Sequence, residues 1–294
     1  MKFLNFGSLN LDIVYSVPHI VSPGETISST SMDVFPGGKG LNQSVALSRA
    51  GGEVFHAGMI GEDGMMLKNI CAENNIHTDY IRLVEEKTGN ALIQVSDSGE
   101  NSIVLFGGAN QTNTKEYVDK VLSNFGKEDV VILQNEINLV DYIIEQAYAR
   151  KMKIVLNPSP FNSKLDTCDF SKVDLFFVNE VEGNQITGKT ESSEILDILE
   201  RKFPDASFVL TLGKNGSIFS DGKERTSCGI YPMPVVDTTA AGDTFTGYFC
   251  FLYYNRKGSI KEILETATKA SAIAVSKKSA VPSIPTMERV MALK

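Results

Sequence analysis

Tryptophan is missing from this chain of 294 residues, and histidine and cysteine are scarce. The three histidines are His19, His56 and His77. They have no metal-ligand spacing, which argues against a zinc site or a histidine-based catalytic triad. The four cysteines are Cys71, Cys168, Cys228 and Cys250, and they form no CxxC pair. We therefore expect reduced, structural thiols in a cytoplasmic protein.

Long apolar runs and dense basic runs are also absent. No stretch reaches the length of a membrane span, and the opening MKFLNFGSLNLDIV lacks the basic-then-apolar order of a signal peptide. Lys and Arg number 28 against 36 Asp and Glu, giving a formal net charge of −8. These features argue against a nucleic-acid or membrane partner.

Strand-like and helix-like segments alternate along most of the chain. Strands are predicted at residues 2–7, 54–59, 91–96, 102–106, 130–134, 154–157, 175–178 and 208–212. Helices are predicted at residues 40–50, 65–73, 114–125, 139–150, 242–254 and 260–277. This alternation predicts a mainly parallel sheet covered by helices on both faces. In such sheets ligands bind beyond the carboxyl ends of the strands.

One group of β-prone segments breaks this rhythm. Residues 14–17 and 26–34 are short and are separated by Pro18, Pro23 and Gly24. With residues 91–106 they could form a small separate sheet. That sheet would be either an ordinary edge hairpin or a lid that keeps water out of a site.

The segment VDTTAAGDTF at 236–245 combines an acidic strand end, small residues and a carboxylate at a helix start. The amides of Ala240, Ala241 and Gly242 would lie where unpaired N–H groups and the helix dipole attract an anion. Asp243 in the first turn could simply complement the dipole. Alternatively, it could orient an attacking hydroxyl and take its proton beside a bound phosphate, as phosphoryl transfer requires.

A glycine-rich turn, PGGKGLNQ at 36–43, leads into the first helix without the GxGxxG or GxxxxGK[ST] spacing. Its glycines allow close approach of a ligand, and Lys39 and Asn42 could donate to hydroxyls, although a turn alone also explains them. Asn10 and Asp12 follow the first predicted strand, where they could hold vicinal hydroxyls or form a turn.

Two later strand ends carry polar residues. Asn179 and Glu182 have the spacing of a helix capping box, and they could also lie near a hydrated magnesium ion. TLGKNG at 211–216 predicts a strand and a tight turn that could cover nucleotide phosphates.

Taken in order, these motifs resemble the ribokinase-like family of carbohydrate kinases along nearly the whole chain. The stretches that carry the resemblance are GGKGLNQS, DTTAAGDTF, NEVEG and TLGKNG, with GSLNLD, SPGET, FGGAN and NPSP in support. The resemblance implies a single domain, residues 1–294, built as an αβα sandwich with a small β lid at about 14–36 and 91–106. It also implies a homodimer contact through that lid.

The activity implied by the resemblance is transfer of the ATP γ-phosphate to a primary sugar hydroxyl, first of all that of ribose to give ribose 5-phosphate. Fructose, 2-keto-3-deoxygluconate or a nucleoside remains an alternative acceptor. A sugar-binding regulator that has lost catalysis is a rival interpretation, but the intact Gly242-Asp243 pair argues against it.

The resemblance also implies roles for single residues. Asp243 is the catalytic base beside an anion hole formed by Ala240, Ala241 and Gly242. The sugar-site positions, besides Asp243, are Asn10, Asp12, Gly38, Lys39, Asn42 and Glu136. The nucleotide-site positions, besides Gly242, are Asn179, Thr211, Gly213 and Gly216.

Two cations are implied in the same way. Glu182 would act on Mg²⁺ through water. A monovalent-cation site that typically holds potassium would comprise Asp237, Thr239, Ala274, Ser279 and Ser283. Leu41 stands where the family often has Ala, which could reshape the sugar pocket. Ser279 stands where Gly is common, a change that a backbone carbonyl ligand would survive.

Overall fold

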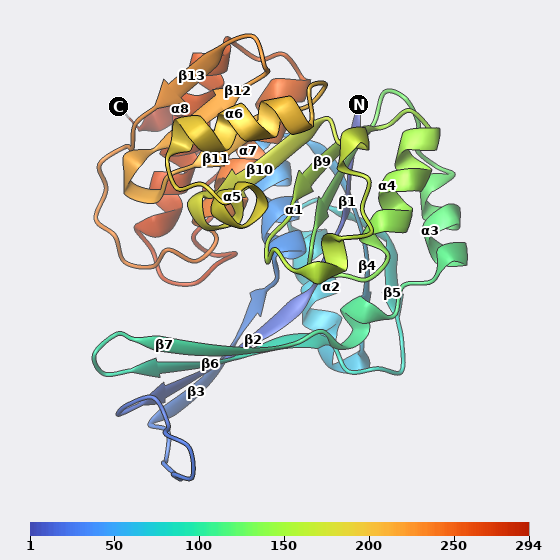
Figure 1. Cartoon of the computed structure of the whole chain (residues 1–294). Helices are drawn as coiled ribbons and strands as arrows, with labels where there is room; N and C mark the ends of the chain where they lie inside the picture. The colour runs from blue at the N-terminus through green and yellow to red at the C-terminus, as the bar shows by residue number, and fades with distance from the viewer. Residues whose placement is uncertain (294) are drawn as a thin grey trace.

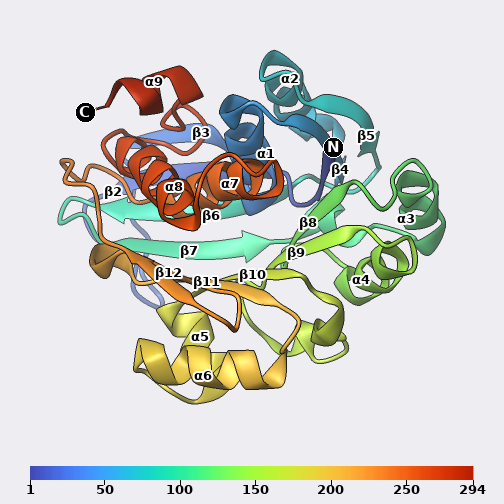
Figure 2. The same cartoon turned by 90° about the horizontal axis from the view of Figure 1, so that it is seen from above.

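The computed structural model describes residues 1–293, and its core is a nine-stranded sheet between two layers of helices (Figures 1 and 2). The strands are β1 (Lys2–Phe6), β4 (Glu53–Ile60), β5 (His77–Leu83), β8 (Val130–Gln134), β9 (Lys153–Asn157), β10 (Leu175–Asn179), β11 (Ser207–Thr211), β12 (Ser217–Ser220) and β13 (Arg225–Cys228). Their order is β13-β12-β11-β10-β9-β8-β1-β4-β5, and every pair from β11 to β5 is parallel. The expected mainly parallel sheet is confirmed.

Figure 2 shows that helices cover both faces of this sheet. On one face lie α1 (Lys39–Ala50), α2 (Met65–Glu73), α7 (Ala241–Tyr254), α8 (Ile260–Val275) and α9 (Met287–Ala292). On the other face lie α3 (Lys115–Leu122), α4 (Val140–Ala149), α5 (Glu180–Thr187) and α6 (Ser192–Lys202). Because both faces are covered, alternate residues of one strand enter different cores: Val130 and Ile132 enter the first, and Val131 and Leu133 the second.

A second sheet of four strands projects from the body (Figure 1), and we call it the lid. It consists of β2 (Asn10–Val17), β3 (Ser31–Gly37), β6 (Gly89–Ser96) and β7 (Asn101–Phe106), in the order β3-β2-β6-β7. The expected separate sheet is confirmed, but its strands begin elsewhere. Asn10 and Asp12 lie inside β2 rather than in a turn, because Asn10 already pairs with Gly37 on one side and Gly89 on the other.

Other predictions were wrong. Asp237 does not end a strand; instead, the amides of Val236 and Asp237 donate to the carbonyl of Val275 at the end of α8. The segment expected to be β-prone from residue 26 becomes a strand only at Ser31. No element was predicted for β5, β12, β13, α6 or α9. The three strands lie at or next to a sheet edge, where the exposed side chains break the apolar pattern.

Two findings concern single residues. Thr114 caps α3 by accepting a hydrogen bond from the amide of Tyr117. The four cysteines are free thiols. In the part of the chain that the structure describes, no helix combines the length and the apolar character needed to cross a membrane.

Candidate active site

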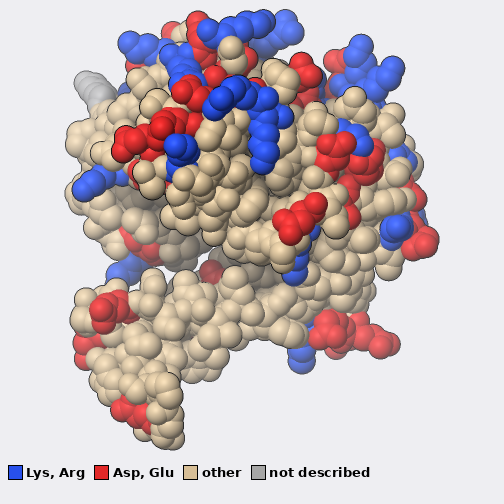
Figure 3. All heavy atoms as spheres, in the orientation of Figure 1, with Lys and Arg blue, Asp and Glu red and all other residues tan. Residues whose placement is uncertain are grey.

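A cavity of about 440 Å³ lies between the lid, the start of α7 and the carboxyl ends of the parallel strands. Figure 3 shows the lid standing away from the body with a hollow between them. Asn157, Asn179 and Thr211, the last residues of β9, β10 and β11, line the cavity, and Glu136 follows β8. The cavity is therefore at the edge of the sheet where ligands bind in this architecture.

Most of the residues singled out from the sequence meet in this cavity. It is lined by Asn10, Asp12, Gly38, Lys39, Asn42, Glu136, Asn179, Glu182, Thr211, Thr239, Ala240, Gly242 and Asp243. Ala241, Gly213 and Gly216 instead line a neighbouring pocket. Asp237, Ala274, Ser279 and Ser283 line neither of the two.

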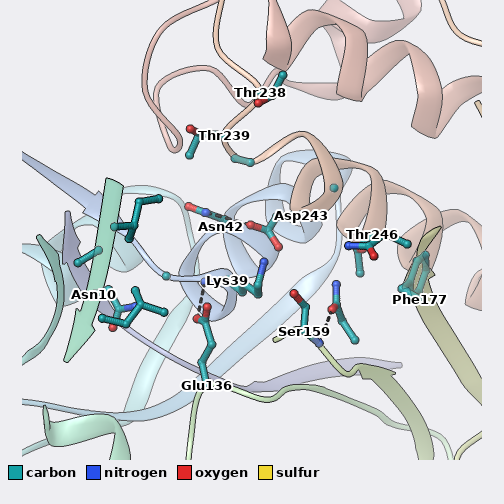
Figure 4. Close-up of a pocket in the computed structure, with 18 of the residues that line it drawn as sticks. Asn10, Lys39, Asn42, Glu136, Ser159, Phe177, Thr238, Thr239, Asp243 and Thr246 are labelled. Carbon is teal, nitrogen blue, oxygen red and sulfur yellow. Dashed lines mark hydrogen bonds between the residues drawn. The ribbon is translucent and has the colours of Figure 1, made fainter. Parts of the chain in front are cut away.

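Asp243 lies in the first turn of α7 and is 7% exposed. Asn42 donates its Nδ2 hydrogen to Asp243 Oδ2 at 3.0 Å, and Gln43 donates its Nε2 hydrogen to Oδ1 at 2.9 Å. In Figure 4 the side chains of Asn42, Lys39 and Asp243 converge on the cavity. Each carboxylate oxygen accepts one amide hydrogen and keeps a further lone pair for a ligand.

The helix start beside Asp243 is open. Ala240 has a left-handed backbone, with φ of 62°, and its carbonyl accepts the amide of Thr244. A Cβ atom added to Gly242 would meet no protein atom within 4 Å. Gly242 lines both pockets, so it lies where they adjoin. Nothing in the packing of the described residues requires glycine here, which leaves the space for a ligand.

Lys39 is surrounded by acidic groups. Burial alone would lower the pKa of its ammonium, but the charges of Asp243, Glu136 and Glu182 together raise it. Its backbone N–H donates to Glu136 Oε2 at 3.0 Å, as Figure 4 shows, and Ser8 Oγ donates to the same oxygen. Burial raises the pKa of Glu136, opposed by Lys39 and by these hydrogen bonds. Lys39 thus supplies the positive charge that this acidic cavity needs to accept an anion.

Asp12 extends from the lid into the cavity. Burial, followed by the nearby charges of Glu136 and Asp243, raises its pKa to about 7. Its carboxylate lies across Gly37, because a Cβ atom there would come within 2.2 Å of Asp12 Oδ2. The glycine in the PGG motif therefore makes room for the Asp12 side chain.

Asn10 is oriented by a residue that the sequence analysis did not assign to the site. Asn110 donates to Asn10 Oδ1 at 2.7 Å, and its own Oδ1 accepts the amide of Leu9 at 3.0 Å. Asn110 belongs to the stretch FGGAN, so the signal was present in the motif but not assigned to a residue.

The sequence analysis also missed part of the cavity wall. The missed residues that line it include Ala91, Ile93, Ile103 and Leu105 from the lid, with Asn157, Ser159, Phe177 and Thr246 from the body. The lid residues could have been found because they alternate along β6 and β7, which places them on one face of the sheet.

A neighbouring pocket of about 960 Å³ shares Asn179, Thr211, Thr238 and Gly242 with the first. Its walls are mostly apolar and include Ile230, Tyr231, Met233, Val235, Ala272 and Val275. Gly216, at φ of 90°, closes its turn so tightly that a Cβ atom would come within 2.0 Å of the Cys228 carbonyl. The loop at 230–236 has no periodic pattern, so its role as a pocket wall could not be predicted.

Asn179 and Glu182 form the capping box that their spacing predicts. Asn179 Oδ1 accepts the amide of Glu182, and Glu182 Oε2 accepts the amide of Asn179, each at 2.9 Å. Glu182 is 5% exposed and lines the cavity. The capping interpretation is confirmed, and the carboxylate also faces the space where a cation could lie.

Asp237 joins two loops. Its Oδ1 accepts the amide of Thr239 at 2.8 Å and its Oδ2 the amide of Ser279 at 3.0 Å. Burial alone would raise the pKa of Asp237, but the hydrogen bonds from Thr239 and Ser279 lower it. Ser279 has φ of 72°, the left-handed region that favours glycine. Its buried Oγ has no hydrogen-bond partner among the described residues.

The chain is similar to known carbohydrate kinases. A family model described as pfkB family carbohydrate kinase matches residues 2–287. The ribokinase of Haemophilus influenzae is 37% identical over 295 residues, covering 97% of this chain and 95% of that protein. The crystal structure of ribokinase from Cryptococcus neoformans var. grubii serotype A in complex with ADP has a TM-score of 0.86 at 33% identity, covering 99% of this chain and 98% of that one. Arabidopsis thaliana ribokinase complexed with ribose and ATP has a TM-score of 0.86 at 28% identity, covering 99% and 97%.

Proposed function

This chain belongs to the pfkB family of carbohydrate kinases, and we propose that it transfers the γ-phosphate of ATP to the primary hydroxyl of ribose, forming ribose 5-phosphate. The observation that carries the proposal is the position of Asp243 at the open start of α7, between a polar cavity and a larger apolar pocket. We further propose that residues 1–294 act as one kinase domain with its lid.

The polar cavity suits a small polyol. Asp12, Asn10 and Asn42 line it from two directions, the first two from the lid and the third from α1. Asn42 Oδ1 is buried and has no hydrogen-bond partner among the described residues. Because an unpaired buried acceptor costs free energy, a sugar hydroxyl that donates to Asn42 Oδ1 would be favoured. Asn42 Nδ2 is already bonded to Asp243, so that hydroxyl would lie close to the base.

The apolar pocket suits the base and ribose of a nucleotide. The turn at Gly213 and Gly216 lies at one side, and Gly242 lies at the junction with the polar cavity. A triphosphate that extends from this pocket toward the junction would bring its γ-phosphate to the amides at the start of α7, the group of Ala240, Ala241 and Gly242. The amide of Ala241 already donates to the Thr238 carbonyl at 3.2 Å, so in this arrangement the amides of Ala240 and Gly242, with Lys39, would stabilise most of the charge of the transferred group.

In the proposed reaction, the primary hydroxyl oxygen of the sugar forms a bond to the γ-phosphorus as the bond from that phosphorus to the bridging oxygen of ADP breaks. Asp243 holds the hydroxyl in line and takes its proton. Positioning of the hydroxyl by Asp243 contributes more to the rate than proton removal, since phosphoryl transfer requires little covalent chemistry from the protein. The lid residues Ile93 and Leu105 would exclude water from the reacting atoms.

The cation assignments fit the chemistry of the residues present. Among the described residues, no group of three or more His, Cys, Asp or Glu side chains could hold a metal ion directly. Glu182 would instead hold Mg²⁺ through water, and the ion would neutralise phosphate charge. Potassium would be held beside the loop that leads into α7, by Asp237, Thr239, Ala274, Ser279 and Ser283. The unpartnered Ser279 Oγ and the close approach of Asp237 to both loops support that site.

We also propose a homodimer through the lid. Val34, Ile13, Leu92 and Val104 pair in register and form one row across all four lid strands. Their neighbours Ala91, Ile93, Ile103 and Leu105 line the cavity, so this row faces outward. Val104 is 63% exposed and Val34 43%, and few charged side chains appear on the visible face of the lid in Figure 3. A second lid would cover this apolar row.

The four free cysteines support a reducing location, and we propose the cytoplasm.

The decisive test of the proposed function is a panel of acceptors. Phosphorylation of ribose, fructose, 2-keto-3-deoxygluconate and adenosine should be compared at one saturating ATP concentration. We expect the highest kcat/KM with ribose. A higher kcat/KM for any other acceptor would refute the ribose assignment and leave the kinase assignment intact.

A further inference from the structure

A chain of buried side-chain amides links Asp243 to the central strands of the sheet. Gln43 on α1 donates to Asp243 Oδ1 at 2.9 Å, and its Oε1 accepts the Nε2 hydrogen of Gln134 at 2.7 Å. Gln134, the last residue of β8, donates its other hydrogen to Asn5 Oδ1 on β1 at 3.1 Å. Asn5 in turn donates to the carbonyl of Gly40 at 2.9 Å, which returns the chain to α1. The chain thus runs from the carboxylate through three amides and back to the helix that carries Gln43.

The chain determines which end of the Gln43 amide faces Asp243. Gln134 Nε2 has both hydrogens committed, one to Asn5 and one to Gln43, so the acceptor end of Gln43 must face Gln134. The donor end of Gln43 then faces the carboxylate. Rotation of this amide by 180° would place oxygen against oxygen on one side and N–H against N–H on the other.

The surroundings of the chain prevent it from shifting. Asn5, Gln43 and Gln134 are fully buried. Gly7 makes space for them, because a Cβ atom there would lie within 2.4 Å of Gln134 Oε1 and 2.6 Å of Asn5 Oδ1. Helices α1 and α7 touch closely at Gly247, where a Cβ atom would come within 2.4 Å of the Ala46 Cβ. The donor helix and the helix of the carboxylate are therefore held at a fixed separation.

From this arrangement we infer that Gln43 is a positioning residue, which holds the Asp243 carboxylate in the orientation that receives the sugar proton. The inference rests on the proposed function, since it assumes that Asp243 is the base. Asn42 has a different task in this account: it touches both Asp243 and the cavity and so can contact the sugar. Gln43 does not line the cavity and acts on the reaction only through Asp243.

The neighbouring residue provides a matched control. Ser44 follows Gln43 on α1, is fully buried and makes a hydrogen bond of 2.8 Å to His56 Nδ1. That contact has no connection to Asp243. Ser44→Ala therefore removes a buried hydrogen bond from the same turn of the same helix without touching the amide chain.

The test measures kcat and KM for ribose at saturating ATP in the full chain. Gln43→Met keeps the side-chain length but removes the donor. We expect kcat to fall by about 10- to 100-fold, because a small displacement of a reacting group has effects of that order, while the KM for ribose changes far less. Ser44→Ala should lower the temperature of unfolding but leave kcat unchanged.

Gln43→Met is then also made in the Asp243→Asn background. If Gln43 acts only through the carboxylate, Gln43→Met should lower the residual kcat by less than about twofold there. An equal fold-loss in both backgrounds would mean that the residue is merely structural, and would overturn the inference. If Asp243→Asn itself retained normal turnover, the assigned base would fail, and the positioning role with it.

A second variant supplies a readout that a packing defect would not move. Gln43→Glu places a carboxylate against Asp243, and two adjacent carboxylates compete for one proton. The other charged groups near Asp243 are Lys39, Asp12 and Glu136, which this variant does not alter. We expect the acid limb of the kcat–pH profile to move upward by about one pH unit or more. An unmoved limb would overturn the inference.

Discussion

Asn42 and Asp243 are 201 residues apart in the sequence, and a hydrogen bond of 3.0 Å joins them inside the cavity. The bond connects the two longest motifs of the chain, the glycine-rich turn and the late helix start. Each motif alone has an ordinary structural explanation. Their contact favours the functional interpretation, because neither the turn nor the helix start needs the other motif for its local structure.

The first prediction concerns this carboxylate. Asp243→Asn keeps the size of the side chain but removes its capacity to take a proton. We expect kcat with saturating ATP and ribose to fall about 10²-fold or more, with a smaller change in KM. Near-normal turnover in a variant with an unchanged unfolding temperature would disprove the assigned role.

The second prediction separates ligand space from packing space at two glycines of α7. A Cβ atom at Gly242 would meet no protein atom, so Gly242→Ala should leave the unfolding temperature unchanged but raise the KM for ATP and lower kcat. Gly247→Ala should lower the unfolding temperature, because its Cβ atom would come within 2.4 Å of the Ala46 Cβ. Calorimetry and steady-state kinetics on both variants check the contrast. If Gly242→Ala were fully active, the space in front of it would not hold a phosphate.

The third prediction concerns pH. Asp12 has a pKa raised to about 7 by burial and neighbouring acids, so the folded protein keeps this proton at pH values where the unfolded chain, near 3.8, has lost it. The stability that Asp12 contributes is therefore present at low pH and is lost as pH rises from about 4 to 7, by up to about 1.4 kcal/mol per pH unit. Urea unfolding between pH 5 and 8 should show this slope, and Asp12→Asn should remove it. An equal slope in both proteins would contradict the assignment.

Ionisation of Asp12 should also matter for the sugar. The ionised carboxylate accepts hydroxyl hydrogens with both oxygens, whereas the protonated form has one acceptor fewer. We expect the KM for ribose to fall as pH rises through about 7. The KM of Asp12→Asn should be higher throughout and independent of pH in this range.

The fourth prediction concerns His56, which lies fully buried beside the amide chain. Its Nε2 lies 3.2 Å from the carbonyl of Gly7, which can only accept, so this nitrogen carries the proton and Nδ1 accepts from Ser44. Burial lowers the pKa of His56 to about 4, from 6.5. The unfolded chain takes up a proton first, so stability is lost as pH falls below 6.5, by about 2 kcal/mol at pH 5.

His56→Gln should be less sensitive to acid than the unchanged protein. The comparison is the difference in unfolding free energy between pH 7 and pH 5 for each protein, which cancels the cost of the substitution itself. The same difference in both would show that His56 does not titrate in this range.

The fifth prediction tests the lid contact. Val104→Asp puts a charge in the centre of the outward apolar row, and we expect a dimer to dissociate into monomers in sedimentation experiments. Met291→Glu is the matched control, because Met291 is 70% exposed on α9, away from the lid. A dimer that survives Val104→Asp would place the contact elsewhere.

The buried parallel strands were the part of the fold most open to prediction. Residues 130–133 of β8 are apolar without interruption because both faces of the strand are covered, and the expected bounds of the strand, Val130–Gln134, are those observed. β13 has the opposite character: Arg225 and Ser227 are exposed at the sheet edge, and no apolar pattern marks it. The start of β2 was misread because Asn10 and Asp12 favour turns locally, whereas pairing with two strands overrides that preference.

The site shows the same division. Asp243 and Lys39 belong to motifs in which glycines allow close approach of a ligand and charged side chains can contact it, so both residues could be predicted. Gln43 belongs to the same motif but gave no signal, because its importance depends on Gln134 and Asn5, which are distant in the sequence. The role of the loop at 230–236 could not be predicted either, since the loop becomes a pocket wall only when it packs near α8.

Val104 and Leu105 are consecutive residues of β7, one in the outward row and the other in the wall of the cavity. A slip of β7 by a single position against β6 would exchange their sides. The side chains that β7 contributes to the cavity wall and to the outer surface would then both change. The proposed sugar site and the proposed dimer contact therefore depend on alternate residues of one short strand, so a backbone change in β7 would alter both.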